Sequence, residues 1–298
     1  MVEKTEKLHV VGEPVLRVDG VQKVRGRALY APDFSRRGML HAKVLWSDRP
    51  HAEIVSIDTD RAMQVPGVKA IVSAEDAPQN RYGVYLKDQL MFASGKVRHI
   101  GEPLAAVAAV TEEAAQEALQ YIDVVYTELP TVFDPFEAMQ EDAPIIHPDL
   151  ESYEATYSKI AYGNVALYTK LAVGDPEKGF EEADQVFEDE FKTQPMYQGY
   201  VEPKACVAGF DARDKLTVWT SNQQIAECHA ELAAALDVPM TDVRVVGTAL
   251  GGGFGGKLKS FLEPIAALLA MKTGMPVKMV LTREEDMIAN RARPPYTI

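Results

Sequence analysis

The residues with the clearest chemical potential form one run, residues 251–257, with the sequence GGGFGGK. Five of these seven are glycine, which is costly unless the backbone needs a positive φ or must approach another group closely. Residues 242–250 before the run predict a strand, and residues 258–272 after it predict a helix. A glycine turn at a helix N-terminus offers free N–H groups and a positive dipole end. The run therefore predicts a site for an anionic group.

Two phosphate-binding patterns fit this run in part. Gly251, Gly253 and Gly256 satisfy G-x-G-x-x-G, the fingerprint of dinucleotide-binding dehydrogenases. The next strand is followed by Glu284, a marginal match to the acid that binds the ribose in those enzymes. A P-loop needs Ser or Thr after its lysine, but Leu258 stands there. A turn without any ligand is the remaining alternative, and the density of glycine disfavours it.

The elements that must position this run are a mixture of strands and helices. Apolar runs and alternation predict strands at 39–46, 52–58, 68–73, 104–110, 122–126, 183–191, 204–211, 216–221, 242–250 and 276–282. Helices are predicted at 112–121, where Thr111 is the cap, at 224–235, and at 258–272. The interpretation is an α+β fold.

Composition narrows the functional class. The chain has 298 residues, 47% of them hydrophobic, and a net charge of −13, so we expect it to bind neither nucleic acid nor an anionic membrane. Cys206 and Cys228 are too few for an iron–sulfur cluster or a zinc site and are expected to be buried free thiols. The charged start and the lack of a membrane-spanning run predict a cytoplasmic protein.

Several further motifs occur in a consistent order along the chain. They are residues 12–14 (GEP), 18–30 (VDGVQKVRGRALY), 97–107 (VRHIGEPLAAV), 163–165 (GNV), 200–203 (YVEP), 220–223 (TSNQ), 282–286 (TREED) and 293–296 (RPPY). Together with the glycine run, they resemble the large subunit of the molybdenum hydroxylases, the xanthine dehydrogenase and aldehyde oxidase family. The resemblance implies an N-terminal arm (1–17), an α/β hammerhead domain (18–130), a linker (131–162) and the first part of an α+β molybdopterin-binding domain (163–298).

The same resemblance implies which residues form the site. Gly252, Gly253, Phe254, Gly255 and Gly256 are expected to bring backbone amides to molybdopterin and to the oxygen ligands of molybdenum, with Phe254 as a wedge and donor. None of them is expected to be a direct metal ligand.

Three further predictions concern side chains around the loop. The family's glutamine that donates to an oxygen ligand of molybdenum matches Gln223, at the family's spacing from Gly251, and an amide suits this role because it donates without adding charge. Tyr200 and Glu202 are expected near the substrate pocket, although Glu202 has an equally good structural interpretation as the partner of a nearby arginine.

Position 258 departs from the xanthine-oxidising members. Those enzymes have a glutamate there that binds the purine, whereas this chain has Leu258. The resemblance therefore implies an aldehyde or another N-heterocycle, with a carboxylate-bearing ring such as nicotinate as one option.

The chain also lacks two later parts of the family pattern, the second cofactor loop and the C-terminal glutamate base. We therefore expect a second molybdopterin-binding subunit to complete the site, with iron–sulfur clusters and FAD on further subunits. The cytosine dinucleotide form of the pterin is one option. A truncated sequence, a nicotinamide-dependent dehydrogenase and a non-catalytic scaffold are the alternatives.

Overall fold

The computed structural model describes residues 10–156 and 161–298. Its strands are β1 (Leu40–Trp46), β2 (Ala52–Asp58), β3 (Val68–Ser73), β4 (Lys96–Val97), β5 (Pro103–Ala109), β6 (Asp123–Glu128), β7 (Ala205–Phe210), β8 (Leu216–Thr220), β9 (Val243–Gly247) and β10 (Val277–Val280). Its α-helices are α1 (Gly20–Val24), α2 (Asp60–Met63), α3 (Glu112–Leu119), α4 (Pro135–Ala138), α5 (Pro176–Glu182), α6 (Ile225–Leu236), α7 (Leu262–Thr273) and α8 (Arg283–Ala289). The predicted α+β class is confirmed.

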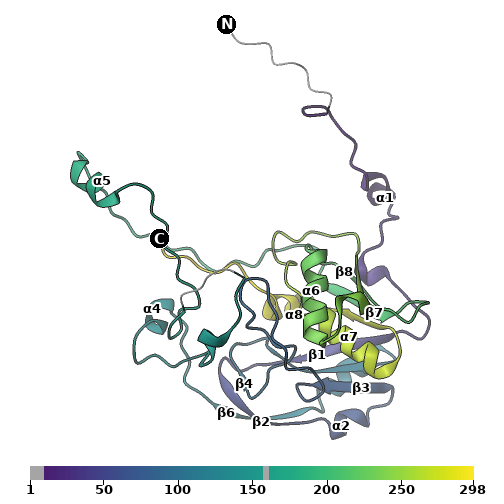
Figure 1. Cartoon of the computed structure of the whole chain (residues 1–298). Coiled ribbons are helices and arrows are strands. Elements are labelled where there is room, and N and C mark those ends of the chain that lie inside the picture. Colours follow the sequence, from purple (N-terminus) through teal and green to yellow (C-terminus); the bar gives the residue numbers. More distant parts are fainter. Residues whose placement is uncertain (1–9, 157–160) are drawn as a thin grey trace.

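A seven-stranded mixed sheet in the order β3-β5-β1-β10-β7-β8-β9 forms the centre of the molecule (Figure 1). Strands β1 and β10 pair in parallel, with Leu40 beside Val277, and so join the N-terminal and C-terminal parts of the chain. A smaller sheet has the order β4-β2-β6. Because the predicted regions 18–130 and 163–298 both contribute strands to the large sheet, they meet in one continuous body.

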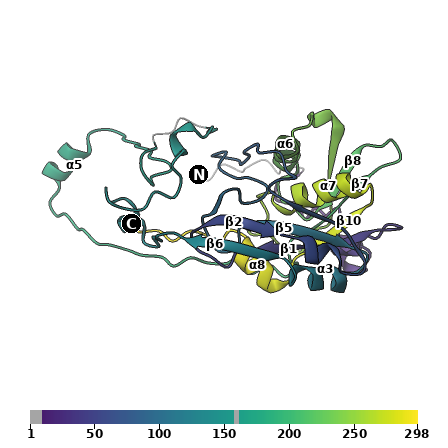
Figure 2. The same ribbon diagram turned by 90° about the horizontal axis from the view of Figure 1, so that it is seen from below.

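Helices cover both faces of the large sheet. Figure 2 shows α6 and α7 on one side of it and α3 and α8 on the other. Strand β5 lies between these layers and is buried from Leu104 to Ala109, as its unbroken apolar sequence predicted. Thr111 caps α3 by accepting a hydrogen bond from the backbone N–H of Ala114, also as predicted.

Two predicted elements differ from the structure. The helix after the glycine run begins at Leu262 and not at Leu258, because the backbone N–H groups of Ser260 and Phe261 donate to the buried carboxylates of Glu231 and Glu263 and not to helical carbonyl partners. Residues 183–191 form no strand. They are exposed throughout and lack a neighbouring strand along most of their length, and alternation alone cannot make a stable strand without a partner.

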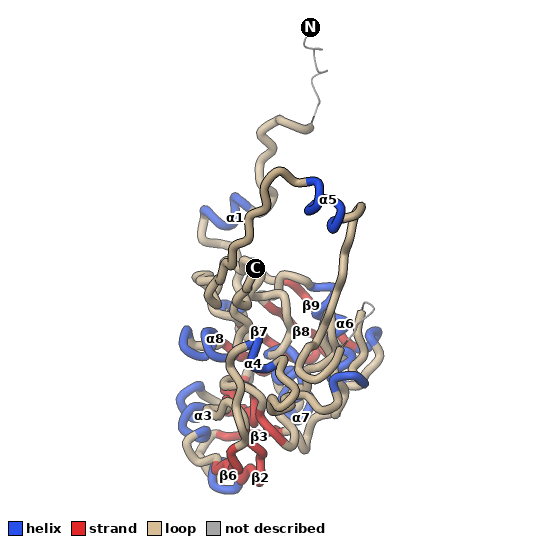
Figure 3. Tube along the Cα trace, turned by 90° about the vertical axis from the view of Figure 1, so that its left-hand side faces the viewer, coloured by secondary structure: helices blue, strands red, loops and turns tan. Residues whose placement is uncertain are grey.

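Residues 166–196 are exposed throughout and extend away from the sheets, with α5 near the tip (Figures 1 and 3). Helix α5 buries none of its residues. At the base of this arm, Met196 pairs with Arg293 and Lys192 with Thr297 in short antiparallel bridges. Residues 1–9 of the predicted N-terminal arm and 157–160 of the predicted linker lie outside the described residues.

Cys206 and Cys228 are both free and buried, which confirms the prediction for them. No helix in the described ranges combines the length and the apolar character that crossing a membrane requires.

Candidate functional site

Residues 251–257, called the glycine loop below, connect β9 to the segment before α7. Gly252 and Gly255 have φ values of +95° and +92°, which glycine adopts without a steric penalty. Phe254 also has a positive φ, +51°, and its carbonyl oxygen accepts a hydrogen bond of 3.3 Å from Arg293. These angles turn the chain sharply and leave the Phe254 side chain 64% exposed.

Gly253 is required for a different reason. A Cβ atom there would stand 2.4 Å from Cδ of Gln223, so the glutamine amide occupies the space of the missing side chain. Gly251 and Gly256 are packed as tightly, against Glu202 at 2.5 Å and Tyr200 at 2.6 Å. The loop is thus held against side chains of this chain itself.

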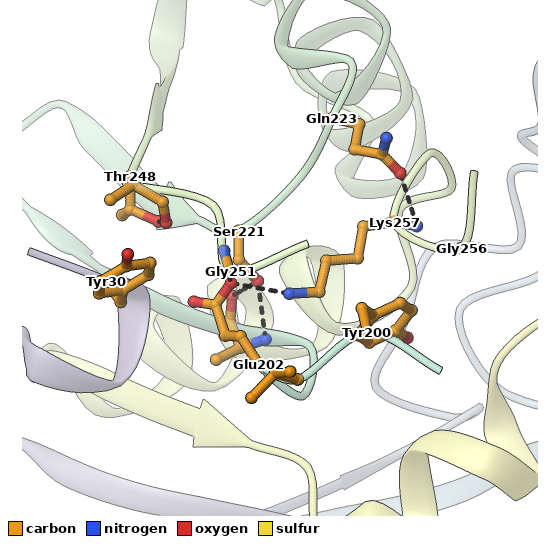
Figure 4. A network of polar contacts seen from close by, with 12 residues as sticks. Tyr30, Tyr200, Glu202, Ser221, Gln223, Thr248, Gly251, Gly256 and Lys257 are labelled. Carbon is orange, nitrogen blue, oxygen red and sulfur yellow. Dashed lines mark hydrogen bonds and ion pairs between the residues drawn. The ribbon is translucent and has the colours of Figure 1, made fainter. Parts of the chain in front are cut away.

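Gln223 follows β8 and precedes α6, as predicted for a residue at a strand end. Its Oε1 accepts hydrogen bonds of 3.1 Å from the backbone N–H groups of both Gly255 and Lys257. Figure 4 shows the Gln223 side chain directed toward the loop near Gly256 and Lys257. The backbone N–H of Gln223 donates a hydrogen bond of 2.8 Å to the carbonyl oxygen of Lys257. The side chain is exposed, and its amide nitrogen has no hydrogen-bond partner in residues 10–156 and 161–298. Gln223 therefore anchors the loop through its oxygen while its NH2 group stays free to donate.

The backbone amides of the glycine loop divide into two sets. Those of Gly251, Gly255, Gly256 and Lys257 donate to acceptors within the chain. Those of residues 252–254 have no acceptor in the part of the chain that the structure describes. Of the five residues predicted to bring amides to the cofactor, Gly255 and Gly256 therefore have their N–H groups already bonded, and the free set is Gly252, Gly253 and Phe254.

Beneath the loop lies a buried ion pair between Lys257 and Glu202. Nζ of Lys257 is 2.7 Å from Oε2 of Glu202 (Figure 4), and the side chains are 0% and 9% exposed. The same carboxylate oxygen accepts a hydrogen bond of 2.7 Å from the backbone N–H of Gly251. The anticipated structural partner of Glu202 was an arginine, and that expectation is wrong: the partner is Lys257. Burial lowers the pKa of Lys257, and its bond to Glu202 opposes that shift.

Tyr200 packs against the buried side of the loop and is 1% exposed. Its hydroxyl donates a hydrogen bond of 2.7 Å to the carboxylate of Asp286 in α8. Nζ of Lys257 lies 4.7 Å from the centre of the Tyr200 ring. Asn290 donates to this hydroxyl and, at 2.8 Å, to the carbonyl oxygen of Gly256. Burial and the bond to Asp286 raise the pKa of Tyr200 far above its usual value. Tyr200 is therefore a neutral support for the loop.

Sequence reasoning assigned no role to Asp286, Asn290 or Arg293. Asp286 is 0% exposed and also accepts a hydrogen bond of 2.9 Å from the hydroxyl of Tyr197. For Asp286 and Arg293 the available signal was the pair of motifs at 282–286 and 293–296, which the family resemblance included without a function for their members, whereas Asn290 lies between these motifs. These residues were missed because their partners lie more than thirty positions away in the chain.

Two N–H groups in the segment between the glycine loop and α7 are bonded to carboxylates of this chain. The backbone N–H of Ser260 donates to Glu231 at 3.1 Å, and that of Phe261 donates to Glu263 at 3.2 Å. Both carboxylates are buried, and the residues that they bind lie just before α7, which begins at Leu262. The free amides of the loop thus lie at a turn and not at a helix end.

The sheet order disfavours the dehydrogenase alternative. A dinucleotide fingerprint opens a βαβ unit of a doubly wound, largely parallel sheet. Here β9 and β10 flank the loop and α7 in the chain, but β7 and β8 lie between them in the sheet, and β10 pairs antiparallel with β7. The glycines therefore do not occupy the turn of a mononucleotide-binding half.

Two family models match the chain. Residues 25–130 match the aldehyde oxidase and xanthine dehydrogenase a/b hammerhead domain, and residues 158–298 match the molybdopterin cofactor-binding domain. The two matched ranges contain the motifs that carried the resemblance, except residues 12–14 and the first part of the motif at 18–30.

Curated relatives agree over nearly the whole chain. The nicotinate dehydrogenase large molybdopterin subunit of Eubacterium barkeri is 37% identical over 97% of this chain and 65% of its own length. A probable xanthine dehydrogenase subunit of Bacillus subtilis is 37% identical over 95% of this chain and 36% of its own length. This chain thus spans less than two thirds of either relative.

Solved structures share the fold. Quinoline 2-oxidoreductase from Pseudomonas putida aligns with a TM-score of 0.78 and 28% identity, covering 91% of this chain and 34% of that one. Aldehyde oxidoreductase from Desulfovibrio gigas aligns with a TM-score of 0.82 and 25% identity, covering 94% and 31%.

Proposed function

Because this chain belongs to the aldehyde oxidase and xanthine dehydrogenase family, the molybdenum hydroxylases, we propose that its glycine loop forms one wall of a molybdopterin site in an oxidoreductase. The cofactor, when bound, supplies the two-electron oxidation of the substrate with oxygen derived from water. The residues of this chain bind and orient that group.

The observation that carries this proposal is the set of unused donors on one loop. The N–H groups of Gly252, Gly253 and Phe254 and the NH2 group of Gln223 have no acceptor among residues 10–156 and 161–298. Successive N–H groups in such a turn bind anionic oxygens, and molybdopterin carries a phosphate and oxygen ligands on its metal. The donor set therefore fits the group through amides alone. Among the residues described, no cluster of His, Cys, Asp and Glu is suited to hold a metal ion directly.

Within this site we assign Gln223 the task of donating to an oxygen ligand of molybdenum. Its oxygen is fixed by two loop amides, so the direction of its NH2 group is set before the cofactor binds. A donor that is already oriented stabilises developing charge without reorganisation. The Lys257–Glu202 pair and Tyr200 hold the loop from below.

For the substrate we propose an aldehyde or an N-heterocyclic aromatic ring that contacts the exposed side of the loop. Phe254 and Leu258, 64% and 37% exposed, are the apolar groups available there. Leu258 offers neither a charge nor a hydrogen bond, so recognition on this side is by shape and apolar contact. Tyr200 and Glu202 act on this pocket from beneath the loop. Relatives named for nicotinate and quinoline support a ring substrate.

We further propose that additional polypeptide completes the site and supplies the glutamate base. The exposed donors and the extended segment 166–196 provide surfaces for it, and the Eubacterium relative is named as one large molybdopterin subunit. A second molybdopterin-binding subunit and subunits with iron–sulfur clusters and FAD would pass electrons onward. The cytosine dinucleotide form of the pterin and the cytoplasmic location stay predictions.

The test is to purify the native assembly that contains this chain and to measure molybdenum, pterin and nicotinamide. We expect molybdenum and pterin in equal amounts, together with oxidation of an aldehyde or a heterocycle. Bound nicotinamide without molybdenum would instead support the dehydrogenase. An assembly with neither group would support the scaffold.

A further inference from the structure

A pocket of about 320 Å³ lies where segment 81–103 meets segments 259–261 and 288–291. Of the residues described, none from the glycine loop or Gln223 lines it. The motif at 97–107, which carried part of the family resemblance, forms one side of it. The other side follows the glycine loop directly, because Lys259 and Phe261 belong to the link between that loop and α7.

The pocket is basic although the chain carries a net charge of −13. Four cations line it, against the carboxylates of Asp88 and Glu102. The cations are Arg81, Arg98, Lys259 and Arg291, and the other polar lining residues are Gln89, His99, His147 and Asn290. The carboxylate of Glu102 already has a partner, because it accepts a hydrogen bond of 2.6 Å from the backbone N–H of Arg98. Burial and the nearby Arg98 lower the pKa of His147 to about 4, so this ring adds no charge at neutral pH.

Lys259 and Arg98 have hydrogen-bond donors that the described residues do not fully satisfy. Lys259 is partly buried and makes no ion pair within the described ranges. Burial, followed by repulsion from Arg291, lowers its pKa to about 8. The Arg98 side chain is 13% exposed, and its terminal nitrogen Nη1 lies 3.8 Å from Oε1 of Glu102 and donates a hydrogen bond of 3.3 Å to the carbonyl oxygen of Lys96. Its Nε, however, is a buried donor without an acceptor among the described residues. Leaving such donors without an acceptor costs free energy, and a bound anion would remove that cost for both.

The rest of the wall is apolar and rigid. Trp46 and Phe261 line the pocket with their rings in an edge-to-face contact, 6.2 Å between centres. Gly101 has a φ of +86°, and a Cβ atom there would stand 2.4 Å from the carbonyl oxygen of Ile288. The two sides of the pocket are therefore locked together at a position that only glycine can occupy.

We propose that this pocket binds a small organic anion, a carboxylate or phosphate group attached to a flat apolar body. Lys259, Arg98 and Arg291 bind the charged end, and Trp46 with Phe261 contacts the apolar end. The pocket shares Asn290 with the support of the glycine loop, but it contains none of the free donors of that loop, and it needs no metal or pterin to form.

The experiment measures the affinity of benzoate and of inorganic phosphate for the full chain and for its native assembly by calorimetry. Lys259→Met keeps the volume and removes the charge. Lys69→Met is the matched control, because Lys69 is exposed and forms no ion pair with any residue that the structure describes. Charge-assisted hydrogen bonds contribute about 1.5–3 kcal/mol, so we expect Lys259→Met to weaken binding about 10- to 100-fold. Molybdenum content and the Lys69→Met affinity should not change.

Several outcomes decide between the possible occupants. Benzoate binding tighter than phosphate binding, with loss in Lys259→Met, supports an organic anion, whereas phosphate alone would overturn the apolar half of the proposal. A further outcome is that the anion binds the isolated chain but not the assembly. That result would overturn the proposal of a free small ligand, and it would assign the pocket to a carboxylate of another polypeptide. If Lys259→Met does not fold, Arg291→Gln at the exposed rim takes its place, and unchanged affinity there would also overturn the proposal.

Discussion

Lys257 and Lys259 stand two positions apart but have opposite surroundings. Lys257 is 0% exposed and lies 2.7 Å from the carboxylate of Glu202, so its charge is neutralised within the fold. Lys259 lies in the basic pocket without an ion pair among the described residues, and its pKa falls to about 8. The Lys257–Glu202 pair holds the backbone of the glycine loop in place, whereas the charge of Lys259 is available to a ligand.

The same contrast holds for hydrogen-bond donors. Below the glycine loop, Tyr200, Asp286 and Asn290 bond one another and the backbone. Above it, the amides of residues 252–254 are unused. A network whose members satisfy one another makes a rigid support, and donors left over on that support are the binding groups. The predictions below test this division.

The largest effect is expected from Lys257→Met. It leaves the carboxylate of Glu202 buried without its counter-ion, which typically costs about 3–5 kcal/mol. Denaturant unfolding should show this loss, whereas Lys178→Met, in the exposed pair with Glu182, should change stability by less than about 0.5 kcal/mol. Adding Glu202→Gln should recover part of the loss, and no recovery would argue against the pair as its source.

Gln223→Glu separates the two functions of that side chain. The carboxylate can still accept from Gly255 and Lys257, but it cannot donate as the amide does. In the native assembly we expect molybdenum content to be kept and turnover to fall about 100- to 1,000-fold, as for loss of one preorganised donor. Gln223→Ala should be at least as slow and should also loosen the loop. The neighbouring Gln224→Ala is the control, and equal rates for Gln223→Glu and Gln224→Ala would contradict the assigned role.

Gly255→Ala tests whether the loop's conformation holds the cofactor. An alanine at a φ of +92° is strained and should destabilise by more than about 1 kcal/mol. The shifted amides of the loop should then lose molybdopterin, measured as molybdenum per chain, while circular dichroism stays close to that of the parent. Gly274→Ala imposes a similar strain after α7, at a φ of +66° with open space around it, and should retain the metal. Full molybdenum occupancy in Gly255→Ala would remove the loop from the site.

The smallest effect concerns Lys259→Met and its dependence on pH. The pKa of Lys259 falls from 10.5 to about 8 on folding, so the folded chain binds this proton less tightly than the unfolded chain does. The charge of Lys259 therefore destabilises the fold fully below pH 8, and this penalty disappears as the pH rises towards 10.5. Asp88 and Glu231 oppose the shift, and Lys204 adds to it. Lys259→Met should be more stable than the parent at pH 7, with a gain that shrinks between pH 8 and 10.5 in thermal unfolding. A gain independent of pH would point to packing instead of charge.

Much of the fold could be predicted from local sequence. The unbroken apolar run of β5, the Thr111 cap of α3 and the helix around Cys228 need only neighbouring residues to be recognised, and all three are present. The two misplaced elements depend on distant residues. Residues 183–191 needed a strand partner, and the start of α7 is set by the buried carboxylates of Glu231 and Glu263.

The sequence by itself determined that residues 251–257 form a turn that requires glycine, because five glycines cannot be stabilised by a helix or a strand. It also determined the family, through the order of motifs along the chain. Only the tertiary structure decided which amides of that turn are free, since Gln223, Glu202 and Tyr200 reach it from far along the chain. It likewise decided that Lys257 is neutralised and Lys259 is not, because burial and ion pairing depend on what the fold brings beside each charge.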